Sequence, residues 1–151
     1  MNESKVINTL KNKIFENINN GLYMKSLNPL KYSTFTIAPD GTGLRVQQLG
    51  DFTLIWIHFH KIIKKANELG GKMYRGDELP QVSGFKLGKE IPYDCMEGFI
   101  ASELLYTEAG SSITRRSTYY SGILAWAGII TIHRSQGNGS FITVNDEYRD
   151  I

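Results

Sequence analysis

Few side chains in this sequence are spaced for catalysis or metal binding. His58 and His60 are two residues apart, and such residues on a helix point about 200° apart, so they do not share a metal ion. The sequence has no second cysteine and no set of carboxylates at ligand spacing to complete a zinc site, and no partner histidine is evident for Cys95. We interpret its thiol as a small buried side chain. We therefore predict no catalytic residue, no metal site and no cofactor.

Basic and aromatic side chains gather instead in one segment, residues 111–144, which reads SSITRRSTYYSGILAWAGIITIHRSQGNGSFITV. Its adjacent arginines, Arg115 and Arg116, come shortly before two adjacent tyrosines, and the segment then becomes apolar. An arginine can donate two hydrogen bonds to the edge of a guanine base. Alternatively, the arginines are solvated or ion-paired and the tyrosines cover the core. The segment indicates a surface presented to a partner, and the alternative of a purely structural role for these residues stays open.

The elements that must position these residues follow from apolar spacing and from turn residues. Helices are predicted at 4–18, 51–69, 94–104 and 111–127. Strands are predicted at 33–38, 43–49, 129–133 and 140–144, with a possible short strand near Met73-Tyr74. Pro39-Asp40-Gly41 is a turn between the first two strands, and a polar, glycine-containing loop joins the last two. This order predicts an α+β protein.

Capping residues set the expected helix boundaries. The predicted N-caps are Asp51, Asp94 and either Ser111 or Ser112. Asp94 and Glu97 have the spacing of a capping box. Gly70-Gly71 and Gly128 are expected to end the second and fourth helices.

The motif SSITRRSTYYSGILAWAGIITI and the elements around it resemble the winged helix-turn-helix family of DNA-binding domains. In this motif a polar cap precedes arginines, and an apolar ending leads directly into a strand. The resemblance covers residues 94–144, with the helix at 51–69 as the first helix. It implies a winged-helix domain at 51–146, a tail at 147–151, and a helix and hairpin extension at 1–50 packed on the core. A looser resemblance is to DNA-recognition modules of restriction–modification proteins.

The resemblance makes 111–127 the recognition helix and the last two strands the wing. The outward stripe of this helix would contain Arg115, Thr118, Tyr119 and Gly122, with Tyr120 in the core and Trp126 at its border. The expected contacts to bases are Thr114, Arg115, Arg116 and Tyr119. The expected contacts to the DNA backbone are Lys61, Lys64, Lys65, Ser112, Ser117, Arg134, Gln136 and Asn138.

These residues predict sequence-specific binding of double-stranded DNA, by a transcriptional regulator or by a target-recognition module. Such a module would work with a catalytic domain or partner subunit, and a homodimer is also open. One alternative is a protein–protein adaptor built on the same fold. Another is a nuclease with an unrecognised metal site, because Pro39-Asp40 begins like the nuclease signature of many restriction enzymes, although the acidic-x-lysine element does not follow.

Length and composition fit one globular domain. The chain has 151 residues, of which 41% are hydrophobic, and a formal net charge of +2, which is too small to identify a partner. No apolar run approaches the roughly 20 residues of a membrane span, so no membrane partner is expected. A single cysteine excludes an intramolecular disulfide and fits a reducing compartment. The expected location is the cytoplasm.

Overall fold

The computed structural model describes residues 4–17, 23–25, 34–39, 41–46, 49, 52–76, 86–89, 91–113, 116–134 and 140–151. It is a mixed α+β structure with antiparallel sheets. The first elements are α1 (Lys5–Asn17), β1 (Tyr23–Lys25), β2 (Thr34–Pro39), β3 (Gly43–Val46), β4 (Thr53–Ile55), α2 (Trp56–Glu68) and β5 (Lys72–Tyr74). The remaining elements are α3 (Met96–Phe99), the π-helix η3 (Ile100–Leu104), α4 (Ser117–Trp126), β6 (Ile130–Arg134), β7 (Ser140–Val144) and the 3-10 helix η4 (Asp146–Tyr148).

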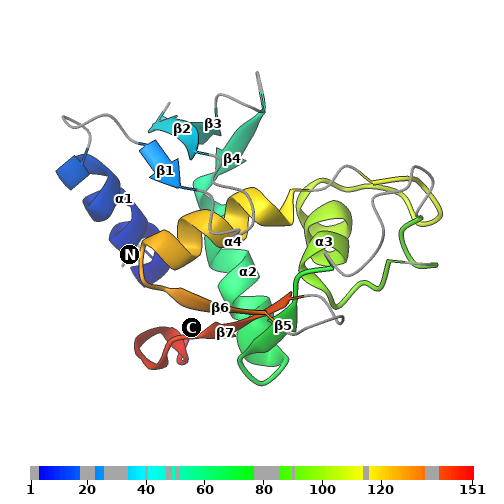
Figure 1. The fold of residues 1–151 in the computed structure, drawn as a ribbon. Helices are drawn as coiled ribbons and strands as arrows, with labels where there is room; N and C mark the ends of the chain where they lie inside the picture. Colours follow the sequence, from blue (N-terminus) through cyan, green and yellow to red (C-terminus); the bar gives the residue numbers. More distant parts are fainter. Residues whose placement is uncertain are drawn as a thin grey trace.

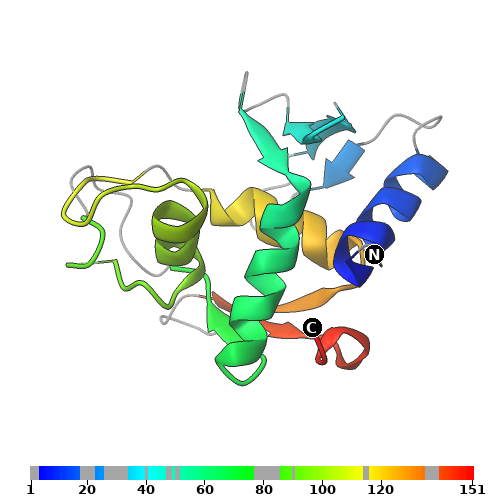
Figure 2. The same ribbon diagram turned by 180° about the vertical axis from the view of Figure 1, so that it is seen from behind.

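The molecule has a sheet at each end and helices between them. Strands β1-β2-β3-β4 form one sheet and β5-β7-β6 the other, and α4 crosses the space between the two sheets (Figures 1 and 2). Helices α1 and α3 lie on opposite sides of α2. The main hydrophobic cluster extends from Val6 of α1 to Tyr148 of η4, so the N-terminal elements share a core with the rest of the chain.

The predicted N-terminal hairpin is confirmed. Strands β2 and β3 pair in antiparallel register, with Ile37 opposite Val46, and Gly41 has a φ of +94° in the turn between them. Only glycine adopts such a φ without strain, which is why the turn falls at this position.

The predicted start of the second helix is wrong. Residues 53–55 form β4, in which Leu54 lies opposite Leu44 of β3, and the helix begins only at Trp56. Ile55 is the last residue of β4, and its side chain is exposed. The backbone groups of β3 offer hydrogen bonds along a strand, and this non-local pairing outweighs the local helical pattern. Asp51, the predicted cap, lies outside the described residues.

Helix α2 otherwise follows its apolar pattern and ends as expected. Its buried residues are His58, Phe59, Ile62, Ile63 and Ala66. The chain then turns at Gly70 and Gly71, whose φ values are +92° and +88°. This turn leads directly into β5, the short strand that the sequence left as a possibility.

The third helix is capped differently from the prediction. Asp94 is exposed, and the N-cap is Cys95, whose Sγ accepts a hydrogen bond from the Gly98 N–H at 3.4 Å. The predicted capping box is therefore wrong, because the Glu97 carboxylate accepts hydrogen bonds from the start of α4 and not from its own helix. The helix continues as η3 to Leu104, the predicted end.

The fourth helix begins later than predicted. Ser112 forms an isolated bridge with Lys86 instead of capping a helix, and α4 starts at Ser117. Residues 111–113 thus run beside residues 86–87, where the Ser111 carbonyl accepts from the Leu87 N–H at 3.0 Å. Helix α4 ends at Trp126, and Gly128, the glycine expected to end it, follows with a φ of +80°.

The last two strands are confirmed, and β5 joins them. Ile132 lies opposite Ile142, and Met73 of β5 lies opposite Ile142 on the other side, so β7 is the central strand. After β7, Tyr148 of η4 is buried at 4% exposure, so the predicted tail at 147–151 is in part docked on the core. Of the helices that the structure describes, none has the length and apolar character needed to span a membrane.

Candidate functional site

A buried carboxylate caps the N-terminus of α4. Glu97 of α3 is 4% exposed, and its Oε1 accepts hydrogen bonds from the backbone N–H groups of Arg116 at 2.8 Å and Ser117 at 2.9 Å. The N-terminal N–H groups of a helix lack intrahelical partners and carry a partial positive charge. Glu97 therefore satisfies two donors and places a negative charge at this end, where a phosphate could otherwise bind.

Glu97 also belongs to a chain of buried hydrogen bonds that reaches the last two strands. Its N–H donates to the carbonyl of Arg75 at 3.2 Å, directly after β5. Arg75 is 5% exposed, and its guanidinium donates through Nη1 to the Ser140 Oγ at 2.8 Å, at the start of β7. These contacts, called here the Glu97 network (Arg75, Glu97, Arg116, Ser117 and Ser140), connect the loop end of the β6–β7 hairpin to the start of α4.

No local pattern in the sequence predicts this network. Glu97 lies among apolar residues of α3, and its side-chain partners lie 19 and 20 residues further along the chain. Its buried position could only be recognised after α3 and α4 had been placed side by side.

Of the two adjacent arginines before α4, the structure describes Arg116. Arg116 is half-buried, and its guanidinium lies over the ring of Phe52 at 4.4 Å from the centroid. A cation in this position is held by the face of the ring. Arg116 thus packs on the segment before β4 instead of pointing freely outwards, whereas Thr114 and Arg115 lie outside the described residues.

Fewer residues of α4 are exposed than the sequence predicts. Thr118 is exposed and Tyr119 is partly exposed, as expected for the outward stripe. Gly122 is buried, which contradicts its place in that stripe. Ser117 is 1% exposed, and its N–H is held by Glu97, so its side chain is not presented to a DNA backbone in this conformation. In Figure 1, α4 lies between the two sheets and beside α2, so much of its length is enclosed by other elements.

The inward face of α4 is confirmed by Tyr120. This side chain is fully buried, its ring centroid is 5.1 Å from that of Phe59, and its hydroxyl lies 3.0 Å from His58 Nδ1. Burial raises the pKa of Tyr120. Burial and, secondarily, the charge of Lys61 lower the pKa of His58, which favours the neutral imidazole against the hydroxyl.

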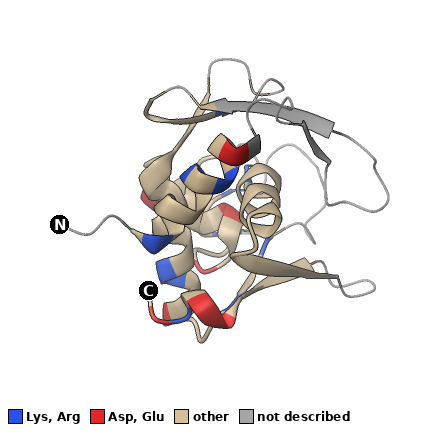
Figure 3. Cartoon of the chain, turned by 90° about the vertical axis from the view of Figure 1, so that its left-hand side faces the viewer, with Lys and Arg blue, Asp and Glu red and all other residues tan. Residues whose placement is uncertain are grey.

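Helix α1 covers the other end of α4 with long basic side chains. The Lys13 ammonium lies 5.3 Å from the ring of Trp126, and the Lys11 ammonium lies 5.5 Å from the ring of Trp56. Figure 3 views this side of the molecule, where basic segments lie on α1 and acidic segments lie near the C-terminus. These lysines pack against aromatic rings of the protein itself.

Three lysines of α2 that were predicted to contact the DNA backbone lie around one hollow. Lys61, Lys64 and Lys65 line this shallow hollow of about 160 Å³ together with Glu68 and Phe99. The side of α2 that faces Tyr120 of α4 carries His58 and Phe59. At about 100° per residue, Lys64 lies roughly opposite this side, whereas Lys61 and Lys65 lie within about 60° of His58. Helix geometry therefore turns Lys64 away from α4 and leaves Lys61 and Lys65 beside the face that packs on it.

The ends of the last two strands lie near the side on which α4 begins. In Figures 1 and 2, the end of β6, the beginning of β7 and the N-terminal end of α4 all lie toward α3. Arg134 is the last residue of β6 and pairs with Ser140. Gln136 and Asn138, the other predicted contacts of the wing, lie outside the described residues. Ser112 is exposed before α4.

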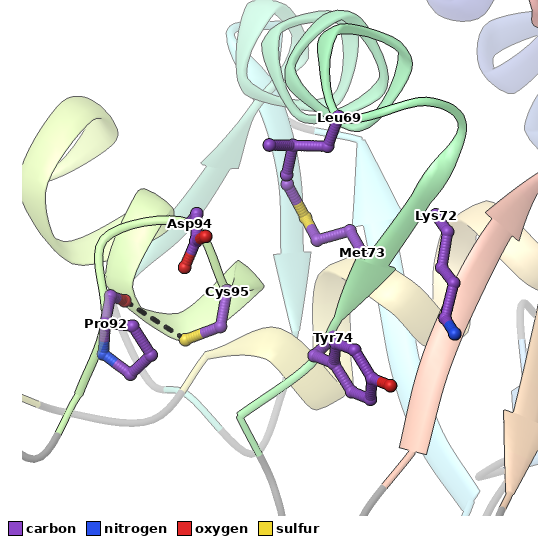
Figure 4. Close-up of a pocket in the computed structure, with 7 residues that line it drawn as sticks. All are labelled: Leu69, Lys72, Met73, Tyr74, Pro92, Asp94 and Cys95. Carbon is purple, nitrogen blue, oxygen red and sulfur yellow. Dashed lines mark hydrogen bonds between the residues drawn. The ribbon is translucent and has the colours of Figure 1, made fainter.

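A separate hollow of about 390 Å³ lies beside β5 and contains Cys95. Its lining comes from the end of α2, from β5 and from the segment before α3 (Figure 4). Cys95 is buried, and its thiol donates to the Pro92 carbonyl at 3.3 Å, which supports the interpretation of a structural side chain. Within the described part of the chain, no three His, Cys, Asp or Glu residues are grouped as metal ligands.

Comparison of this chain with models of protein families, with curated proteins and with solved structures finds no match.

Proposed function

We propose that residues 52–144 form a winged helix. The support is the order α2, α3 and α4 followed by the β6–β7 hairpin, with β5 between the first two helices adding a third strand beside β7. The Glu97 network strengthens this proposal, because it couples the hairpin to the start of α4 through buried hydrogen bonds. A recognition helix and a wing must keep a fixed mutual position to contact one groove and its flanking backbone.

We further propose that this unit binds double-stranded DNA in a sequence-dependent way. The observation that carries the proposal is the placement of the N-terminal end of α4 on the same side as the strand ends of the β6–β7 hairpin. Thr118 and Tyr119 on the first turn of α4, with Thr114 and Arg115 just before it, would contact base edges. Ser112, Arg134, Gln136 and Asn138 would contact the backbone. The biological setting is transcriptional control, or target recognition for a catalytic domain or partner subunit.

Five predicted contacts change their part in this proposal. Ser117 is removed, because its side chain is buried. Arg116 is removed from the base contacts, because its guanidinium packs on Phe52. Lys61, Lys64 and Lys65 line the hollow beside Phe99 of α3, and we assign them to the attraction of DNA phosphates outside the bound groove.

The test is a fluorescence anisotropy titration with duplex DNA selected from a random pool. If the three lysines of α2 and Arg134 together neutralise about four phosphates, the logarithm of the binding constant falls with the logarithm of the salt concentration with a slope of about −3 to −4. A selected duplex should also bind more tightly than a scrambled one. Absence of binding at low salt, with the protein shown to be folded by circular dichroism, would refute the proposal.

A protein–protein adaptor is the second candidate, and a specific observation favours it. The face of α4 that would enter a groove is partly covered, since Gly122 is buried and Arg116 packs on Phe52. A winged helix with a covered α4 can still present its other surfaces to a protein. This candidate predicts that the DNA titration shows no sequence preference and no salt-dependent binding.

A further inference from the structure

The outward face of the β5-β7-β6 sheet carries a distinct set of side chains. Successive residues of a strand point to opposite faces, and Met73 and Ile142 are buried on the helix side. Their neighbours therefore lie on the outward face, which contains Lys72, Tyr74, Phe141, Thr143, Thr131 and His133. Figure 4 shows Lys72 and Tyr74 directed to the same side of β5, and Met73 directed away from them.

Three rings form a continuous row across this face. Tyr74 lies opposite Phe141 in the β5–β7 register, and His133 lies opposite Phe141 in the β6–β7 register. The ring centroids of Tyr74 and Phe141 are 5.7 Å apart, and those of Phe141 and His133 are 4.8 Å apart with planes only 13° from parallel. We call Tyr74, Phe141 and His133 the aromatic row.

Three further contacts involve the rings of this row. His133 Nε2 lies 2.7 Å from the Thr143 hydroxyl, which fixes the orientation of the imidazole. The Lys72 ammonium lies 4.2 Å from the ring centroid of Phe141 and 5.1 Å from that of Tyr74. The six outward side chains of this face include one lysine and no acidic residue, so the face complements a negatively charged partner.

The rings remain accessible to solvent. Tyr74 is 46% exposed, and Phe141 and His133 are partly exposed. Cross-strand aromatic pairs stabilise a sheet, but this role alone does not require a cation over the rings. A row of accessible rings with an adjacent cation is the arrangement on which unpaired bases stack while their phosphates are neutralised.

We propose that the aromatic row and Lys72 bind single-stranded nucleic acid. Tyr74, at the edge of the sheet, would stack on a base, and Lys72 would pair with an adjacent phosphate. A duplex presents only the edges of its bases in the grooves, so this face selects an unpaired strand. The proposal does not depend on duplex recognition by α4.

The experiment measures binding of the full chain to a fluorescent oligothymidine of about 12 nucleotides, a length within the range that small single-strand binding folds cover. Tyr74→Ala should weaken binding about 5- to 100-fold, because one stacked base is lost. Tyr74→Phe keeps the ring and should bind within about two-fold of the natural protein. Lys72→Gln should weaken binding and make the salt slope shallower by about 0.7.

Matched controls separate this proposal from duplex binding. Thr131→Ala removes a side chain without a ring from the same face and should leave oligothymidine binding unchanged, and Tyr74→Ala should leave the affinity for duplex DNA unchanged. The proposal is overturned if the natural protein does not bind oligothymidine at low salt. It is equally overturned if a folded Tyr74→Ala variant binds as tightly as the natural protein.

Discussion

Glu97 is the residue on which the geometry of the candidate site depends most directly. Its carboxylate is almost completely buried, and it accepts from two N–H groups at the start of α4. Burial of a charge costs free energy unless hydrogen bonds compensate for it. The N–H groups at the start of α4 provide these hydrogen bonds. The carboxylate on α3 in turn fixes the position at which α4 begins.

The first prediction at this scale is that Glu97→Gln lowers the free energy of unfolding by about 1–3 kcal/mol, since charge-assisted hydrogen bonds become neutral ones. Chemical denaturation followed by circular dichroism measures the change. Glu103→Gln is the control, because Glu103 is exposed on the next helical segment and should change stability by less than about 0.5 kcal/mol. Equal stability of the Glu97→Gln variant and the natural protein would show that the carboxylate does not hold α4.

At the scale of elements, the packing of α4 against the core limits the number of its side chains that can contact a partner. Its apolar residues must fill the space between the two sheets, and Tyr120, Ile123 and Leu124 are fully buried there. The residues left for a partner are those of the first turn and those just before the helix. The reading of a base sequence would therefore depend on very few side chains of α4.

We expect different effects from the arginines before α4 and from Arg134 at the end of β6. Arg115→Ala should cost about 1–3 kcal/mol of binding free energy on the preferred duplex and reduce discrimination at one or two base pairs. Arg134→Ala should weaken binding to all duplexes alike and make the salt slope shallower by about one unit.

Arg116→Ala is the matched comparison, because its guanidinium already packs on Phe52. It should reduce sequence discrimination less than Arg115→Ala does. Anisotropy titrations with the selected and scrambled duplexes measure all three variants. If neither Arg115→Ala nor Arg116→Ala changes sequence preference, α4 does not read the bases.

At the scale of the whole molecule, the C-terminal segment holds α1 against α2. The Tyr148 hydroxyl lies 3.0 Å from the Thr9 hydroxyl of α1, and the Lys5 ammonium donates to the Glu147 carbonyl at 2.6 Å. From α2, the Asn67 side chain donates to the Tyr148 carbonyl at 2.9 Å. The N-terminal and C-terminal segments are therefore parts of one core.

Tyr148→Phe tests this connection, because it removes the hydroxyl and keeps the ring. It should lower the free energy of unfolding by about 0.5–1.5 kcal/mol, the usual contribution of one hydrogen bond. Tyr148→Ala should cost more, about 3–5 kcal/mol, since a buried ring is lost. Denaturant titration measures both, and Tyr106→Phe serves as a control because Tyr106 is 81% exposed. An unchanged midpoint for Tyr148→Ala would show that the C-terminal segment does not stabilise the core.

The sequence by itself determined the features that depend on neighbouring residues. Apolar spacing located α1, most of α2, and the strands β2, β3, β6 and β7 within a few residues. Glycines located the turns at Gly41, Gly70 and Gly128, because a positive φ is easy for glycine alone. These are local preferences, so they can be recognised along the chain without knowledge of the fold.

Only the tertiary structure decided the features that depend on distant residues. Residues 53–55 became a strand because β3 lies beside them, and α4 began at Ser117 because Glu97 of α3 caps it there. Gly122 was expected to face outwards, but it is buried in the folded chain, where α4 lies between the two sheets. A pairing, cap or contact between segments far apart in sequence forms only when folding brings them together, and its free energy then exceeds the local preference.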